Sequence, residues 1–416
     1  MFQAILLALT AVMPILLALI ASSLSLVMKL SEANRLRILY FLVFCCTASW
    51  LPLFADYLKD HRLSGFRIGL ILSLPPVMML VVQPFYGMVA DRIGYKKVLL
   101  WSSLLASFTY IFYLFDGGFG YLLVVTLFMA LFYNTLQPIL DSLSLRLSEK
   151  DPSFSYGTLR IAGAAGWAST GIVLGHYIDA INTTVIFIFS AASMLMAFLF
   201  SFYLTNDNRK SSTSTPFTNV KQVFSNPILL FLLFAVVLVS AGATTIWNFY
   251  SIYMKENGAS ASLVGYGLSF QGLCELPMFY FSAMIIQRLG IKTTLIITIL
   301  TTALRLWLYS VINNPKIAIA IEVLHGISWS LFWVVCVECV NSLVKEDWRA
   351  TGQSLLYAAY FGAGAIAGNF WTGYLYDEQL RISQIFLLNA GIVTVVAVVV
   401  AFYFRRKDLL FDRIQH

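Results

Sequence analysis

Three polar residues recur inside one long apolar run in the first half of the chain. Asn134, Gln137 and Asp141 are spaced by three and four residues, which places their side chains along one stripe of a helix. Arg160 opens the next apolar run, and Trp167 lies two turns further along the same face. A guanidinium can hydrogen-bond a carboxylate or several hydroxyls, and an indole offers a flat surface to a ring. We therefore predict that Asn134, Asp141, Arg160 and Trp167 bind a small polar solute. The alternative is an ion pair between two helices with a tryptophan packed beside it.

A second set of ionisable residues lies inside the apolar runs of the other half. Glu322, His325, Trp329 and Trp333 line one face of a run, and Arg305 lies on the run before it. Histidine is the side chain that titrates nearest neutral pH, so such a cluster can accept and release a proton. The predicted proton-coupling residues are Glu275, Arg305, Glu322 and His325. Trp247 and Asn248 are predicted to bind the solute from this half. The alternative is a structural Arg305–Glu322 pair beside a structural histidine.

Several kinds of chemistry have no signature in the sequence. The five cysteines fall inside apolar runs, without the spacing of metal ligands or of disulfide-bonded loops. The sequence has no G-x-x-x-x-G-K-[ST] string to serve an ATP-driven pump and no repeated pore signature of a channel. The ionisable residues are scattered over distant runs rather than set at a catalytic spacing. We expect a protein that is not an enzyme and that uses no metal and no cofactor, with a proton as the coupling ion.

The elements that position these residues must lie in lipid. Of the 416 residues, 59% are hydrophobic, 15% aromatic and 11% charged, whereas an ordinary soluble domain carries about 25% charged residues. Charges this sparse cannot coat a soluble surface, and the aromatic content excludes a solvated disordered chain. A helix needs about 20 apolar residues to cross a bilayer. Thirteen runs are candidates, near 4–28, 36–57, 67–90, 98–115, 121–145, 158–178, 184–204, 227–254, 261–286, 293–312, 317–344, 352–375 and 382–404.

The longest polar interruption, 205–226, is rich in Ser, Thr and charge and is predicted to be a flexible linker. It separates an N-terminal half of six runs, 29–204, from a C-terminal half of six runs, 227–404. Of the 27 lysines and arginines, nineteen lie in loops on the linker's side and six in loops opposite. Positive charge stays on the cytoplasmic side, so the linker and the tail 405–416 are predicted to be cytoplasmic in a multi-pass cell-membrane protein. The net charge of +7 then reflects topology, and no nucleic-acid partner is expected.

The first run, 4–28, does not fit this pattern. No basic residue precedes it, which is poor for a signal peptide. It is either a thirteenth helix with the N-terminus outside or an over-extended start, with Met28 as the true initiator. Because the six-plus-six pattern is complete without it, we favour the second interpretation.

Two landmarks repeat between the halves. The string GMVADRIGYKK at 87–97 has a degenerate copy, QRLGIK, at 287–292, and GHYID at 175–179 has the counterpart GYLYD at 373–377. The offsets, 196 and 198 residues, indicate duplicated six-helix halves. A glycine lets two helices approach closely, and the Asp-Arg pair and lysines anchor a tight turn at an anionic leaflet. The signature positions are Gly87, Asp91, Arg92, Gly94, Lys96 and Lys97.

The full G-x-x-x-D-R-x-G-x-K-K string in this topology resembles the signature loop of the major facilitator superfamily. The resemblance covers nearly all of 36–404. QPFYG at 83–87 and YGTLRIAGAAGWA at 156–168 look like the oligosaccharide/proton symporters of the lactose permease type. LHG at 324–326 also looks like the phenylpropionate- and nucleoside-permease branches. The resemblance implies an all-α integral membrane fold of twelve transmembrane helices in two six-helix pseudo-repeats.

The same resemblance implies roles for individual residues. Asp141, Arg160 and Trp167 fall where the symporters have their substrate-binding acid, arginine and stacking tryptophan, and Arg305 and His325 also match.

The sequence departs from the symporter pattern where proton coupling is concerned. Glu322 replaces a lysine, and Ser328 stands at the position of the proton-accepting glutamate. An acidic position of the symporters aligns with Gly272, and Glu275 follows one turn later. The sequence has carboxylates in these runs, but at positions that differ from the symporter pattern. The identity of the proton acceptor and the identity of the solute are therefore both undetermined.

These observations predict a secondary transporter whose halves enclose a polar cavity near the midplane and rock about one central site. Proton-coupled uptake of a sugar or oligosaccharide is the first hypothesis. Uptake of nucleosides or aromatic acids, and drug/proton antiport, are the alternatives, although paired charges suit a hydrophilic solute better than a lipophilic cation. The expected partners are a small-molecule substrate and the lipid bilayer, and the protein is expected to work as a monomer.

Overall fold

A computed structural model describes residues 30–115, 117–151, 156–205, 226–345 and 349–405. Every regular element in these ranges is a helix, which confirms the predicted all-α fold. Seven of the helical segments among them are long and apolar enough to cross a membrane. The apolar run 4–28, nearly all of the linker 205–226 and of the tail 405–416 lie outside the described residues.

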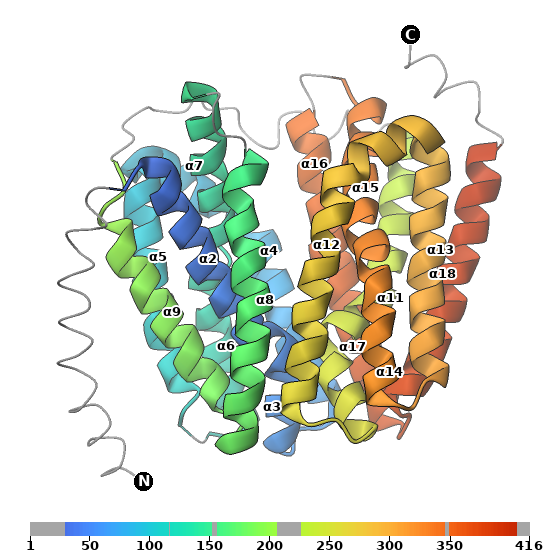
Figure 1. Cartoon of the computed structure of the whole chain (residues 1–416), viewed down its shortest axis with the longest axis horizontal. Helices are drawn as coiled ribbons and strands as arrows, with labels where there is room; N and C mark the ends of the chain where they lie inside the picture. The colour runs from blue at the N-terminus through green and yellow to red at the C-terminus, as the bar shows by residue number, and fades with distance from the viewer. Residues whose placement is uncertain (1–29, 116, 152–155, 206–225, 346–348, 406–416) are drawn as a thin grey trace.

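The described helices form twelve columns, six in each half (Figure 1). The N-terminal columns are α2 (Glu32–Trp50) with η1 (Leu51–Leu53) and α3 (Phe54–Asp60), α4 (Gly65–Ile93), α5 (Tyr95–Phe112), α6 (Phe119–Tyr133) with α7 (Leu136–Lys150), α8 (Tyr156–Ala180), and α9 (Val185–Ser201). The C-terminal columns are α11 (Pro227–Glu256), α12 (Ala261–Leu289), α13 (Ile291–Val311), α14 (Pro315–Ile321) with η2 (Glu322–Leu324), η3 (Gly326–Leu331) and α15 (Phe332–Leu343), α16 (Arg349–Tyr357) with η5 (Ala358–Gly364) and α17 (Ala365–Asp377), and α18 (Ile382–Arg405).

Local turn chemistry sets the ends of these helices. Ser64 and Ser260 cap α4 and α12, each accepting a hydrogen bond from the N–H three residues later. The loops that join α4 to α5 and α12 to α13 are single glycines, Gly94 at φ 96° and Gly290 at φ 78°. A residue with a side chain is strained at these angles, whereas glycine is not. The signature string and its copy therefore make the same turn in each half, as duplication requires.

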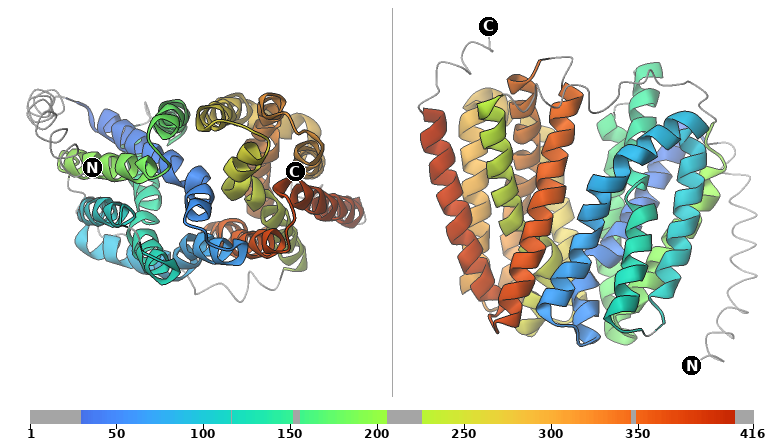
Figure 2. Two further views of the ribbon diagram at one scale, coloured as in Figure 1. Left: turned by 90° about the horizontal axis from the view of Figure 1, so that it is seen from below. Right: turned by 180° about the vertical axis from the view of Figure 1, so that it is seen from behind.

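The two halves form separate bundles that meet chiefly along two pairs of long helices, and α11 also contacts η1 and α3 (Figures 1 and 2). Helix α8 packs against α12, and α4 packs against α17. Glycines allow these crossings: a Cβ on Gly265 would collide with the Gly171 carbonyl, and one on Gly373 with the Gly65 carbonyl.

The contacts between halves gather at one end of the molecule. These glycines lie in the first part of α4 and α12 and the last part of α8 and α17, away from the ends of α9 and α11 that the linker joins. We call this the far end and the other the linker end. In Figure 1 the bundles come together at the far end, beside α3, and spread apart toward the linker end.

Candidate functional site

The fourth column is broken where the sequence predicted a continuous polar stripe. Helix α6 ends at Tyr133 and α7 begins at Leu136, and the two residues between them keep right-handed helical backbone angles. The Asn134 Nδ2 donates to the Pro75 carbonyl of α4 at 2.7 Å. Asn134 is thus engaged in helix packing, and its role in binding the solute stays a prediction.

Asp141 and Arg160 do meet, in the N-terminal half. Arg160 Nη1 lies 3.9 Å from Asp141 Oδ2, and the Tyr40 hydroxyl of α2 donates to Asp141 Oδ1 at 2.7 Å. The guanidinium also lies over the Phe44 ring, 5.9 Å from its centroid. The side chains of Arg160 and Asp141 keep 36% and 20% exposure, so both remain accessible to a solute. This ion pair is positioned by α2, α7 and α8 together.

In the C-terminal half, the four predicted coupling residues form one connected chain. Arg305 of α13 makes an ion pair with Glu322, and the Tyr309 hydroxyl donates to the same carboxylate. Arg305 Nη1 lies 2.8 Å from His325 Nδ1, and His325 Nε2 lies 2.9 Å from Glu275 Oε1 of α12. Glu322, Arg305 and His325 are buried, whereas the Glu275 side chain keeps 21% exposure.

The hydrogen bonds of this four-residue network fix the tautomer of His325. A guanidinium can only donate hydrogen bonds, so Nδ1, which faces Arg305, must accept. The ring proton then sits on Nε2, which donates to the Glu275 carboxylate. A proton on both nitrogens would set an N–H against the Arg305 N–H. His325 is therefore held as a neutral connector between Arg305 and Glu275.

The Asp141–Arg160 pair of the N-terminal half and Glu275 of the C-terminal half are electrostatic neighbours. Glu275 lies near enough to Arg160 to interact with its charge, which links the Asp141–Arg160 pair to the chain of the other half. Three carboxylates (Asp141, Glu275 and Glu322) then oppose two guanidiniums. With His325 neutral, these five residues carry one excess negative charge until one carboxylate is protonated.

Trp167 and Trp247 lie at the junction of the halves. The Trp167 Nε1 donates to the Leu268 carbonyl of α12 at 3.3 Å, and its ring meets that of Trp247 edge to face, with centroids 6.4 Å apart. A Cβ on Gly272 would lie 3.0 Å from the Trp167 ring. The glycine at this position, where the symporters have an acid, thus leaves room for the indole.

Asn248 belongs to a buried amide relay rather than to an open surface. Its Nδ2 donates to Asn369 Oδ1 at 2.7 Å, and Asn369 Nδ2 donates to the Leu72 carbonyl of α4 at 2.9 Å. Pro76 has no N–H to offer that carbonyl within α4, so Asn369 supplies the missing donor from the other half. Asn248 is therefore placed to orient Asn369, and a solute role for Asn248 stays a prediction.

The signature loop lies at the linker end. Lys96 Nζ donates to the carbonyls of Phe202 and Leu204, both at 2.7 Å, so it caps the C-terminal end of α9. Arg92 is exposed at the end of α4. The Gly87 and Asp91 positions lie within α4, but the Asp91 side chain is outside the described part of the structure.

Two residues that join the halves were visible to the sequence only as repeat landmarks. Asp179, at the end of α8, accepts hydrogen bonds from the N–H groups of Ala261 and Ser262 at 2.8 and 2.9 Å. Asp377, at the end of α17, accepts from the N–H groups of Gly65 and Phe66. Each carboxylate thus caps a helix of the opposite half, at the far end. The GHYID and GYLYD repeat marked both positions, but nothing in the sequence showed what they contact.

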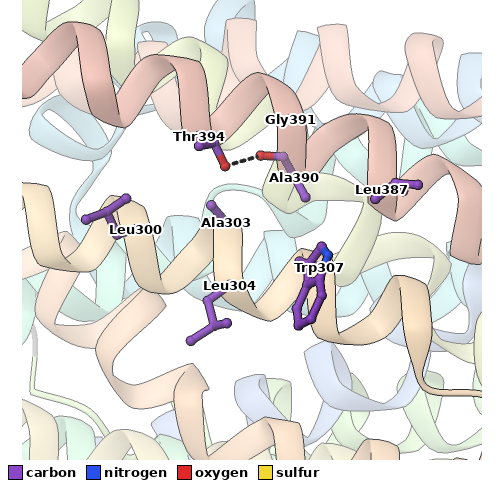
Figure 3. Close-up of a pocket in the computed structure, with 8 residues that line it drawn as sticks. All are labelled: Leu300, Ala303, Leu304, Trp307, Leu387, Ala390, Gly391 and Thr394. Carbon is purple, nitrogen blue, oxygen red and sulfur yellow. Dashed lines mark hydrogen bonds between the residues drawn. The ribbon is translucent and has the colours of Figure 1, made fainter.

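A groove on the outer face of the C-terminal half is a poor candidate for a polar solute (Figure 3). Its lining comes from α13 and α18: Leu300, Ala303, Leu304, Trp307, Leu387, Ala390, Gly391 and Thr394. The Thr394 hydroxyl is already bonded to the Ala390 carbonyl of its own helix. The groove offers no convergent polar groups to orient a ligand. Among the described residues, no group of three or more His, Cys, Asp or Glu is placed to hold a metal ion either.

Comparison with known proteins decides the family. The model of the MFS_1 like family matches residues 33–388. The chain belongs to the MFS_1 like family. This confirms the resemblance to major facilitator superfamily transporters drawn from the signature loop. The MFS_1 like chain is accordingly a multi-pass membrane transporter.

Curated relatives and solved structures agree with this membership. The maltose permease of Geobacillus stearothermophilus is 26% identical over 89% of this chain and 93% of its own length. The sucrose permease of Escherichia coli is 25% identical over 88% of this chain and 92% of its own length. The crystal structure of the nucleoside transporter NupG matches with a TM-score of 0.80 at 19% identity, covering 90% of this chain and 99% of NupG. At that identity the structural match shows the fold.

Proposed function

We propose that this MFS_1 like chain is a symporter of the cell membrane that takes up a sugar or oligosaccharide together with a proton. The linker and the C-terminal tail face the cytoplasm, and the halves rock about the site between Arg160 and Glu275. The structure then corresponds to the state that is closed toward the outside, because the halves meet at the far end.

The observation that carries proton coupling is the excess carboxylate. Glu322 is neutralised by Arg305, and Asp141 lies beside Arg160, whereas the described hydrogen bond of Glu275 goes to neutral His325. A carboxylate at this depth whose described hydrogen bond goes to a neutral ring is costly, so protonation of Glu275 lowers that cost. Glu275 is also the most accessible member of its chain. Glu275 is therefore the proton carrier in this proposal.

The polar groups facing the site support a hydroxyl-rich solute. Arg160 donates and Asp141 accepts, which matches hydroxyls that do both. Maltose and sucrose permeases are among the relatives that align over most of the chain. An aromatic acid would bring its own negative charge toward Asp141 and Glu275.

Uptake by reconstituted protein tests this function. Proteoliposomes containing the full chain are given an alkaline interior and offered labelled maltose, sucrose or uridine. We expect a saccharide to accumulate above its external concentration and to leak out when a protonophore is added. Uridine accumulation without saccharide uptake would instead support the nucleoside alternative, which the likeness to NupG keeps open. Efflux of lipophilic dyes without uptake of any polar solute would contradict symport altogether.

A further inference from the structure

Half-buried aromatic rings from several elements of the C-terminal half form a continuous row. Trp247 of α11 meets Trp329 of η3 with centroids 5.3 Å apart, and Trp329 meets Trp333 of α15 at 5.7 Å. Trp333 meets Tyr357 of α16 at 4.8 Å, and Phe361 of η5 closes the row at 5.3 Å from Trp333. We call these five residues the aromatic row.

Two wide helical turns hold the row in place. Segments η3 and η5 are π-helical, with an extra residue in the turn, and they meet where Trp329 contacts Phe361 at 5.7 Å. Such turns are rare and are frequently found at functional sites, because they change the direction of the side chains that follow. In these two columns the wide turns bring Trp329 and Phe361 into the row.

The row connects the charged groups of both halves. At one end, Trp247 packs on the His325 ring, with centroids 5.2 Å apart, and touches Trp167 of the N-terminal half. At the other end, Tyr357 is an electrostatic neighbour of Arg160 and Asp141. The rings therefore lie along the same space as the ion pair that faces the solute.

The row also offers hydrogen-bond donors. In the described part of the structure, the indole N–H groups of Trp329 and Trp333 donate to no residue. Neither of these two nitrogens is fully buried. A buried indole N–H usually finds a partner, so these two are available to one that arrives from outside.

We propose that the aromatic row is the surface on which a pyranose ring of a carbohydrate stacks, with Trp333 and Tyr357 selecting the solute beside Arg160. The inference rests on the proposed function and names its recognition surface. One face of a pyranose presents C–H groups to an aromatic ring, while its rim presents hydroxyls to Arg160, Asp141 and the free indole N–H groups. Most neighbouring rings of the row are tilted or edge to face, and Trp329 and Trp333 are stacked.

Equilibrium binding to the purified full chain, without a proton gradient, tests the proposal. Maltose, sucrose and uridine are titrated calorimetrically into the wild type and into Trp333→Ala, Trp333→Phe and Tyr357→Leu. We expect Trp333→Ala and Tyr357→Leu to weaken saccharide binding about tenfold or more, and Trp333→Phe to lose clearly less, because it keeps a ring. The matched control is Trp307→Ala, which removes an indole from the outer groove and should leave affinity unchanged.

The outcomes separate this proposal from the proposed function. If folded Trp333→Ala and Tyr357→Leu bind saccharide with unchanged affinity, the proposed stacking surface is wrong. The proposal is also wrong if the wild type binds uridine more tightly than either saccharide. If Trp333→Ala does not melt cooperatively, the saccharide affinities of Tyr357→Leu and Trp333→Phe are compared instead. The proposal then requires the larger loss of affinity in Tyr357→Leu. Saccharide binding that depends on the row, in a protein that does not accumulate saccharide when a pH gradient is imposed, would support the stacking surface while refuting proton coupling.

Discussion

Asp179 and Asp377 stand 198 residues apart, and each accepts two backbone hydrogen bonds from the first turn of a helix in the opposite half. A carboxylate satisfies N–H groups that a helix leaves unpaired at its start, and its charge complements the helix dipole. Duplication of the halves has produced two equivalent caps, one on α12 and one on α4. Both connect the two halves at the far end.

Removal of either cap should loosen the far end. We expect Asp179→Ala and Asp377→Ala each to cost about 1 kcal/mol, as for other helix caps, and the double variant to cost about twice that. Amide hydrogen exchange of peptides containing Gly65–Phe66 and Ala261–Ser262 measures the effect directly. The matched control is Glu378→Ala, next to Asp377, because the Glu378 side chain has no described hydrogen bond. Unchanged exchange in the double variant would show that the two caps do not hold this end closed.

Glu275→Gln should uncouple transport from protons. The amide mimics the protonated carboxyl, so the set Asp141, Arg160, Glu275, Arg305 and Glu322 stays neutral throughout the cycle. We expect saccharide exchange at equal concentrations to persist while accumulation driven by a pH gradient is lost. Glu338→Gln, an exposed glutamate on α15, is the control and should accumulate normally. Full accumulation by Glu275→Gln would show that another carboxylate carries the proton.

Arg160→Ala should abolish solute binding, because Arg160 is the donor of the ion pair and is one-third exposed. Arg160→Lys keeps the charge but loses the planar fork, so we expect weakened rather than absent binding. Calorimetric titration of a saccharide measures both variants. If Arg160→Ala binds the solute with wild-type affinity, the Asp141–Arg160 pair has a structural role only.

The Arg305–Glu322 pair should behave as a buried ion pair. Arg305→Met leaves a carboxylate in the interior without its counter-charge, for which we expect a loss of about 3–5 kcal/mol in unfolding free energy. The double variant Arg305→Met/Glu322→Met removes both charges and should recover most of that loss. Thermal unfolding in detergent micelles provides the measurement. A double variant as unstable as Arg305→Met would show that Arg305 acts mainly through His325.

The sequence predicted the site only in part, and the reason differs from residue to residue. Arg305, Glu322 and His325 were found because each is an ionisable side chain inside an apolar run, where charge is expensive. Asn134 was assigned to a stripe by its helical spacing, and only the structure shows that its amide donates to the Pro75 carbonyl of α4. Tyr40 and Tyr357 were missed, since a tyrosine in an apolar run is ordinary and only its neighbours give it a role.

Sequence alone determined the features that depend on local chemistry. Sparse charge and long apolar runs require a lipid environment, the basic loops indicate the topology, and Gly94 and Gly290 allow the turns that mark the repeat. Contacts between distant helices were decided by the tertiary structure. Helix crossings joined Asp179 to α12 and Glu275 to His325, and π-helical turns directed the aromatic row, because neither register between helices nor an extra residue in a turn leaves a periodic trace in the sequence.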